Sequence, residues 1–106
     1  MIAQTPKLPY YAVIFTSIRT PGDYKAYAEM AELMIDLAQK QKGFLGVESA
    51  RDSLGITVSY WKDLESIKQW KKHSQHQIAQ QKGQSEWYKC YKTRIAKVER
   101  DYSFEK

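Results

Sequence analysis

The stretch FLGVESARDSLGITVSYW, residues 44–61, has the form of two strands joined by a tight turn. Turn-forming residues gather at 52–55 (Asp-Ser-Leu-Gly), and runs rich in β-branched and aromatic side chains flank them. We therefore expect a β-hairpin with strands over about 44–51 and 55–62. The segments on either side of the hairpin then determine which fold contains it.

A helix is expected directly before this hairpin. Over residues 24–43, apolar side chains recur at intervals of three and four, which is the spacing of one helix face. Asp23 is a suitable N-cap, and Gly43 is the residue expected just past the last turn.

Apolar residues with helical spacing also occur after the hairpin. Residues 63–72 (DLESIKQWKK) predict a short helix capped by Asp63. The next residues, Ser74 to Gln77, have the form of a capping box, in which a serine and a glutamine three positions later bond to each other's backbone N–H groups. We therefore expect a break and a second helical piece from about 75 to 82.

The ends of the chain supply the outer strands. Residues 8–20 are rich in aromatic and β-branched side chains in both alternating phases, and 86–104 has the length of a long strand with room for a bulge. The order β-α-β-β-α-β predicts an α+β, ferredoxin-like fold with a four-stranded antiparallel sheet and both helices on one face. Residues 1–8 are expected to be an N-terminal extension of a single domain over 9–106.

Such a sheet has one face without helices. Because the first strand is largely apolar in both phases, we expect this bare face to meet a second copy of the chain, which gives a homodimer.

Composition limits the remaining classes of function. The single cysteine, Cys90, cannot form an internal disulfide, and no run of residues has the length and apolar character of a signal peptide or membrane span. A cytoplasmic protein without a membrane partner is expected. The net charge of +5 comes entirely from residues 62–106, which indicates either an anionic partner or a solvated lysine surface.

A ferredoxin-like sheet also occurs in nucleic-acid-binding modules. Those modules present aromatic rings on the open face together with a Lys/Arg-Gly-Phe-type motif. The last strand, TRIAKVERDYSF, has no such motif and mixes both signs of charge. No nucleic-acid partner is expected.

Several stretches together resemble the antibiotic biosynthesis monooxygenase domain superfamily, in particular its small bacterial branch. They are PYYAVIFTS, GFLGVESAR, ITVSYWKDLESIKQWKKHSQH, WY and VERDYSF, so the resemblance covers about 9–104. Its most specific parts are Gly43 to Arg51 and the spacing from the Ser-Tyr-Trp-Lys run at 59–62 to Trp70.

The resemblance implies a dimeric α+β barrel in which each subunit has a pocket between sheet and helices. It also implies a flat aromatic ligand of the phenol or quinol type, and an activity in which the substrate, as an electron-rich anion, reacts with dioxygen without a cofactor. A non-catalytic, small-molecule-binding dimer on the same fold is the alternative to this first interpretation, because fold alone does not supply function.

Haem degradation is a further activity within this superfamily. The resemblance requires an asparagine on the first strand, a tryptophan on the second helix and a histidine ten residues beyond it as the iron ligand. Trp70 fills the second position, but the first falls near Phe15 and the third on Gln80. The haem motif is therefore incomplete, and no cofactor is expected. A haem-binding or haem-degrading relative stays an alternative if His76 ligates the iron from a displaced helix.

The two histidines lie three residues apart, at His73 and His76. No metal site is expected, because zinc needs three or four ligands and no third histidine exists. His73 is expected to close the first helical piece or to be exposed. His76 is either a packed ring at the helix junction or the catalytic base, since its unperturbed pKa suits removal of a phenol proton.

Aromatic side chains are the candidates for substrate binding. Each of them has an alternative interpretation as ordinary core packing. The candidates are Trp70, Trp61, Tyr60, Phe15, Tyr11 and Tyr91.

Overall fold

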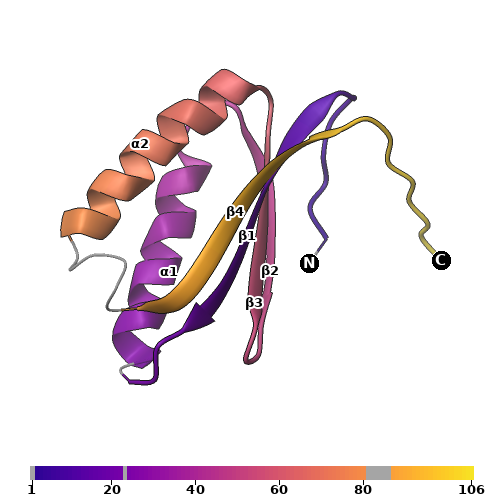
Figure 1. Ribbon diagram of the computed structural model, residues 1–106. Coiled ribbons are helices and arrows are strands. Elements are labelled where there is room, and N and C mark those ends of the chain that lie inside the picture. Colours follow the sequence, from indigo (N-terminus) through magenta and orange to yellow (C-terminus); the bar gives the residue numbers. More distant parts are fainter. Residues whose placement is uncertain (1, 23, 81–86) are drawn as a thin grey trace.

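A computed structural model describes residues 2–22, 24–80 and 87–106, without the side chains of Tyr24 and 76–80. Its elements are β1 (Tyr10–Arg19), α1 (Tyr24–Gln39), β2 (Phe44–Arg51), β3 (Gly55–Trp61), α2 (Leu64–Gln80) and β4 (Tyr88–Val98). The strands form one antiparallel sheet in the order β2-β3-β1-β4. Both helices cover one face of the sheet, and the two ends of the chain lie on the other side (Figure 1). The predicted ferredoxin-like fold is confirmed.

Strand register determines which side chains face the helices. Tyr11, Val13, Phe15 and Ser17 of β1 alternate with residues that face away, and they pair with Trp61, Ser59, Thr57 and Gly55 of β3. The buried cluster of the helix-facing side consists of Trp61, Ala38 and Ile67, with Tyr11, Val13, Phe44 and Trp70 packed against it. The core therefore lies between the helices and the end of the sheet where β3 terminates.

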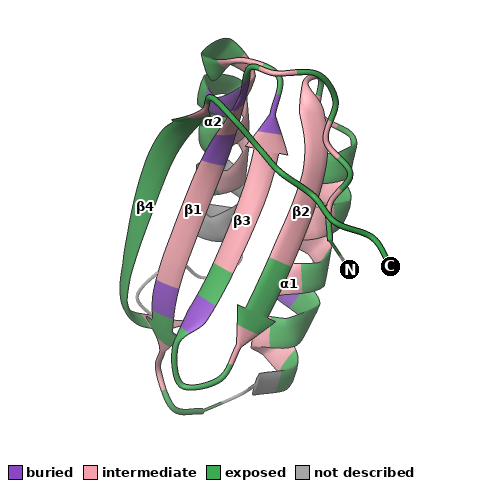
Figure 2. Cartoon of the chain, turned by 90° about the vertical axis from the view of Figure 1, so that its right-hand side faces the viewer, coloured by how far each residue is buried: buried purple, intermediate pink, exposed green. Residues whose placement is uncertain are grey.

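The face without helices is seen directly in Figure 2. Tyr10 and Ala12 of β1 are buried there, because the segments that precede β1 and follow β4 pass over this face. Elsewhere the covering is incomplete: Ile18 is 39% exposed and Ile56 is 41% exposed. This side is called the open face below.

Local signals explain where the helices begin and end. The carboxylate of Asp63 accepts a hydrogen bond from the backbone N–H of Ser66 at 2.8 Å, so Asp63 is the predicted N-cap of α2. Gly43 has φ +89°, as expected beyond a helix, and a Cβ there would overlap the side chain of Ser66. Asp23 lies outside the described residues.

The helix α1 ends at Gln39, a few residues earlier than predicted. The N–H groups of Lys40 and Gln41 bond to carbonyls three residues back, Leu37 and Ala38. The chain tightens there into turns before it reaches Gly43.

The predicted break in the second helix is wrong. The helix α2 runs without interruption from Leu64 to Gln80. The hydroxyl of Ser74 donates to the backbone carbonyl of Lys71 at 3.1 Å, which is how serine bonds in the interior of a helix. Ser74 does not cap a new helix, because its hydroxyl bonds to the Lys71 carbonyl within α2. The predicted end of the second piece, 81–82 and Gly83, lies outside the described residues.

The predicted last strand is too long. The strand β4 ends at Val98, which pairs with Tyr10, the first residue of β1. Beyond Val98 there is no residue of β1 left to pair with, so 99–106 forms no regular structure. A bulge does occur, at Lys89, where the register with β1 shifts. None of the helices within the described ranges is long and apolar enough to cross a membrane.

Candidate functional site

The helix-facing side of the sheet is a surface that changes in character along the strands. At one end, Trp61 and Tyr11 lie in register. At the other end, a row across all four strands contains Arg51, Gly55, Ser17 and Tyr91. The two ends are six residues apart on β1, which corresponds to about 20 Å of strand.

A stack of three rings occupies the first end. Trp61 is fully buried, and its indole N–H donates to the hydroxyl of Ser59 at 2.8 Å. Trp70 of α2 stacks on Trp61, with centroids 5.9 Å apart and planes at 25°. His73, one helical turn further, lies 5.9 Å from the Trp70 ring. Phe44 packs edge-on against Trp61 at 5.4 Å.

The prediction that His73 closes a helix or is exposed is wrong. Because α2 continues to Gln80, His73 lies in the interior of the helix and is half-buried. Its Nε2 atom is buried and has no hydrogen-bond partner among the described residues. Buried polar atoms without partners are uncommon and destabilising, and they concentrate at functional sites. Sequence reasoning missed this residue because it assumed a helix break.

The backbone of His76 lies on α2, but its side chain is outside the described residues, as is that of Gln80. The continuous helix removes the argument that a break separates the two histidines. In the part of the chain that the structure describes, no three His, Cys, Asp or Glu side chains gather in a way that could hold a metal ion.

A cluster of rings occupies the second end. Phe15 lies 5.4 Å from Tyr88 and 5.3 Å from Tyr91, while Tyr88 also packs edge-on against Tyr27 of α1. Burial, followed by a hydrogen bond with Tyr27, raises the pKa of the Tyr88 hydroxyl. Tyr88 therefore stays neutral at physiological pH.

Sequence reasoning missed Tyr88 because of the bulge at Lys89. Simple alternation would place Tyr88 and Tyr91 on opposite faces of β4. The extra residue brings both rings to the helix-facing side, next to Phe15. A bulge has no reliable local signal, so only the pairing with β1 reveals the shared face.

Arg51 reaches into this second end from β2. Its guanidinium group donates a hydrogen bond to the hydroxyl of Ser17, which is 2% exposed, across Gly55 on the strand between them. The guanidinium carbon lies 5.5 Å from the centre of the Tyr27 ring, and that of Arg19 lies 4.9 Å from the same ring.

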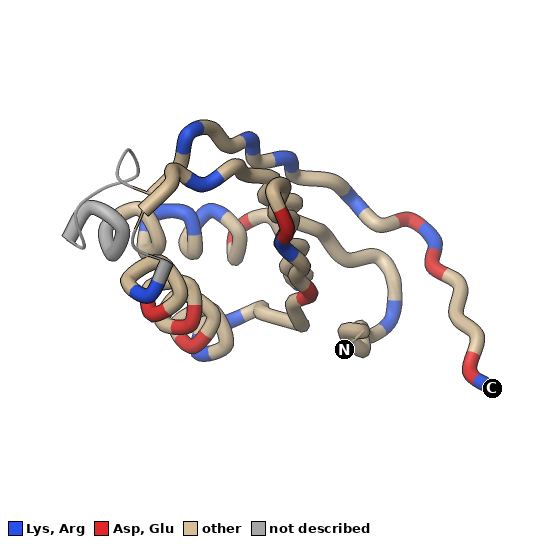
Figure 3. The backbone as a smooth tube through the Cα atoms, turned by 90° about the horizontal axis from the view of Figure 1, so that it is seen from below, with Lys and Arg blue, Asp and Glu red and all other residues tan. Residues whose placement is uncertain are grey.

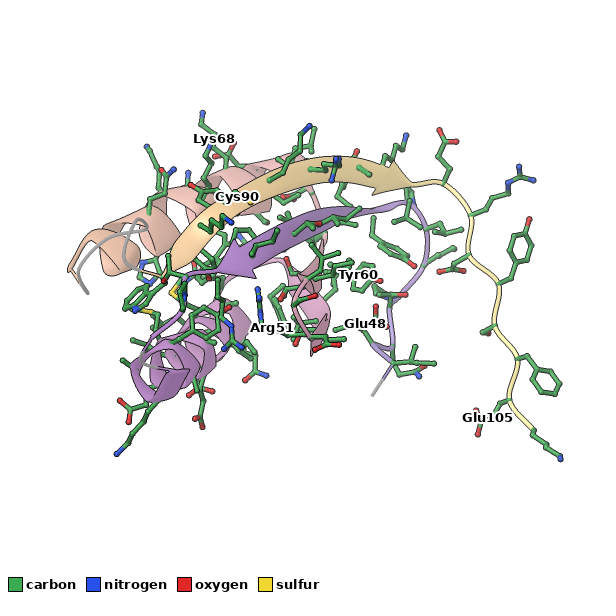
Figure 4. The ribbon with its side chains drawn as sticks, turned by 60° about the horizontal axis from the view of Figure 1, so that its bottom comes forward. Glu48, Arg51, Tyr60, Lys68, Cys90 and Glu105 are labelled. Atoms are coloured by element: carbon green, nitrogen blue, oxygen red, sulfur yellow. The ribbon has the colours of Figure 1, made fainter. Side chains whose placement is uncertain are left out.

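Figure 4 shows Arg51 on the α1 side of the sheet, whereas Glu48 and Tyr60 lie on the opposite side. The candidate Tyr60 is therefore not brought together with the other candidate rings. Its hydroxyl donates to Glu48 at 2.6 Å, and burial, followed by this bond, raises its pKa to about 12. The same carboxylate accepts the N–H of Ala3 at 3.0 Å, so Tyr60 helps to hold the N-terminal segment on the open face.

The structure thus places the sequence candidates in three locations. Trp61, Trp70 and Tyr11 lie at the first end of the helix-facing side, and Phe15 and Tyr91 lie at the second end. Tyr60 lies on the open face. The ring of Phe15, near which the resemblance places the asparagine of haem-degrading proteins, packs against the rings of Tyr88 and Tyr91.

Several solved structures share the fold of this chain. PA3566 from Pseudomonas aeruginosa matches with a TM-score of 0.69 and 16% identity, over 90% of this chain and 97% of that one. A candidate antibiotic biosynthesis monooxygenase from Chloroflexus aurantiacus matches with a TM-score of 0.62 and 17% identity, over 91% and 97%. SnoaB, a cofactor-independent oxygenase from Streptomyces nogalater, matches with a TM-score of 0.68 and 8% identity, over 88% and 95%.

Sequence comparison identifies the family of the chain. The model of the monooxygenase af470-like family matches residues 14–97. The protein YqjZ of Bacillus subtilis is 50% identical over 106 residues, which cover 98% of this chain and 92% of that protein. The chain belongs to the monooxygenase af470-like family.

Proposed function

We propose that the protein is a cofactor-independent monooxygenase that binds a phenol- or quinol-type aromatic molecule between the sheet and the helices. The observation that carries the proposal is the Nε2 atom of His73, which is buried beside the Trp70 ring without a hydrogen-bond partner in the described part of the chain. This places a potential proton acceptor against an aromatic surface, in a chain of a monooxygenase family. Trp61 and Phe15 belong to the ring-rich surface on which a flat substrate would lie.

The chemistry needs little beyond binding, deprotonation and exclusion of water. Removal of the phenol proton gives an electron-rich anion, which supplies electrons to dioxygen. One oxygen atom becomes a carbonyl on a ring carbon that loses its hydrogen, and the other leaves as water with that hydrogen and the phenol proton, so no external reductant is consumed. In this scheme His73 takes the phenol proton through Nε2, and His76 is the second candidate base.

We also propose that the working form is a homodimer joined through the open face. Ile18 and Ile56 are partly exposed there, and the segment after β4 carries Tyr102 at 85% and Phe104 at 89% exposure. Large apolar side chains of this kind, concentrated on one side of a small domain, are typical of an interface. In this dimer, the segment after β4 would lie between the two sheets.

Oxygen consumption by the purified protein tests the proposed activity. A panel of naphthols and polycyclic hydroquinones is added under air, with the protein-free autoxidation rate subtracted, and isotopically labelled dioxygen identifies the oxygen retained in the product. We expect His73→Ala to lose turnover while it retains the fold. Binding of these compounds with no protein-dependent oxygen uptake would instead establish the non-catalytic alternative.

A further inference from the structure

The row of residues at the second end of the sheet is built around the guanidinium group of Arg51. Ser17 and Gly55 are neighbours in this row, and Gly55 is itself buried. A Cβ at position 55 would overlap the guanidinium atoms of Arg51. The glycine therefore provides the space in which the Arg51 side chain crosses β3 to reach Ser17.

One nitrogen of that guanidinium group has no hydrogen-bond partner in the ranges that the structure describes. Arg51 bonds to the hydroxyl of Ser17, but its Nη1 atom is buried and forms no hydrogen bond with any described residue. No carboxylate among the described residues bonds to Arg51. A buried cation that lacks part of its hydrogen bonding destabilises the folded protein, and a hydrophobic side chain of similar size would avoid this penalty.

A second cation approaches the same place. The guanidinium groups of Arg19 and Arg51 both lie against the ring of Tyr27, at 4.9 and 5.5 Å from its centre. The ring attracts each of them, but the two positive charges repel one another across a partly buried site. An anion bound beside Arg51 would reduce this repulsion and supply the missing acceptor.

We propose that Arg51 binds the carboxylate of an aromatic acid, with Tyr27 and Ser17 holding the guanidinium group in position. A planar carboxylate matches the fork of an arginine, and the rings of Phe15 and Tyr91 lie in the same cluster to receive an aromatic body. This inference rests on the proposed function for the location of the substrate. It adds the substrate class, because the phenol would carry an acidic group directed toward Arg51.

Binding of naphthoate and of its neutral carboxamide, measured by isothermal titration calorimetry, tests the site without any need for turnover. We expect wild-type protein to bind the carboxylate more tightly, and Arg51→Gln to lose about tenfold or more of that affinity while binding the carboxamide unchanged. Lys68→Gln is the matched control, because it removes the same charge from an exposed position on α2 that lies outside the ring cluster (Figure 4). It should bind like wild type.

Gly55→Ala gives a second, independent variant. It keeps every charge but displaces the guanidinium group, so it should lose affinity for naphthoate in the same way as Arg51→Gln. Circular dichroism melting establishes that each variant is folded. Equal affinity of the wild type for the carboxylate and the carboxamide, or an equal loss in Lys68→Gln and Arg51→Gln, would overturn the proposal.

The outcomes also separate this inference from the proposed activity. Carboxylate binding through Arg51 without oxygen uptake would support the anion site and contradict the monooxygenase. Oxygen uptake with neutral phenols, together with no preference for the carboxylate over the carboxamide, would support the monooxygenase and contradict the anion site.

Discussion

The indole of Trp70 on α2 lies stacked on that of Trp61, the last residue of β3, and this contact fixes the second helix against the sheet. Because Trp61 is 0% exposed, we expect Trp61→Ala to lower the free energy of unfolding by about 3–5 kcal/mol. Trp70 is only half-buried, and Trp70→Ala should lower it less. Urea titration followed by circular dichroism measures both values. A Trp61→Ala loss below about 1 kcal/mol would contradict the described core.

Replacement of His73, in contrast to replacement of Trp61, should not destabilise the protein. Its buried Nε2 forms no hydrogen bond with the residues that the structure describes, so His73→Phe removes an unsatisfied polar atom and keeps a ring against Trp70. We expect the variant to be as stable as wild type, or more stable by up to about 1 kcal/mol, while oxygen-dependent turnover is lost. Thermal melting and oxygen uptake measure the two effects. A destabilised variant with unchanged turnover would assign His73 to packing alone.

The bond between Tyr60 and Glu48 predicts a dependence of stability on pH. The hydrogen bond from Tyr60 lowers the pKa of Glu48 below its ordinary value of 4.5. The contribution of ionised Glu48 to the free energy of unfolding is therefore present above pH 4.5 and is lost as the pH falls through the lowered pKa. The pKa of Tyr60 is raised from 10.0 to about 12. The contribution of neutral Tyr60 to the free energy of unfolding is therefore present below pH 10.0 and is lost as the pH rises toward about 12.

Tyr60→Phe should lower the free energy of unfolding by about 1 kcal/mol at neutral pH. It should also abolish the fall in stability between pH 10 and about 12, and weaken the fall in stability at low pH. Urea unfolding at a series of pH values gives the curves, and Tyr91→Phe is a control on the other face of the sheet. Parallel curves for wild type and Tyr60→Phe would show that the bond does not form in solution.

Substitution of Gly43 and of Gly22 separates the cost of a positive φ from the cost of steric overlap by the new Cβ. Gly43→Ala should destabilise the protein by at least about 1 kcal/mol, because φ is +89° and the new Cβ overlaps the side chain of Ser66. Gly22, with φ +141° and nothing within 4 Å of a Cβ, controls for backbone conformation alone. Gly22→Ala should lose less stability in thermal or urea unfolding. Equal losses would mean that the approach of α2 to Gly43 is unimportant.

The dimer proposal predicts a role for the segment after β4. Phe104→Ser should raise the dimer dissociation constant about tenfold or more if the ring is buried by a partner. Lys106→Ser is a neighbouring control without an apolar side chain. Light scattering after size-exclusion chromatography over a dilution series gives the mass. A monomer at every concentration for the wild type would exclude the dimer.

Local chemistry determines how much of this structure could be predicted. The hairpin was predictable because the turn at 52–55 and its flanking strands lie next to each other in the sequence. The helix break was a wrong prediction because the Ser74 signal competes with bonding inside a continuous helix, and the sequence contains both possibilities. The strand end at Val98 depends on where β1 begins.

The site was less predictable because its contacts join distant segments. Arg51 and Ser17 are 34 residues apart in sequence, and their bond needs a glycine on a third strand between them. Tyr88 reaches the same cluster only through the bulge at Lys89. The open-face bond of Tyr60 likewise follows from the register of β3. Such relationships exist only once the strands have paired.

The basic residues of β4 extend in a line along the edge of the sheet and continue into the chain that follows (Figure 3). On the open face, the N-terminal segment is fixed to Glu48 through Ala3, and Asp101 accepts a hydrogen bond from Tyr10 at 2.5 Å. An affinity tag at either end would therefore emerge beside the open face. Purification through a cleavable tag, removed before any measurement of mass, is the appropriate route for this protein.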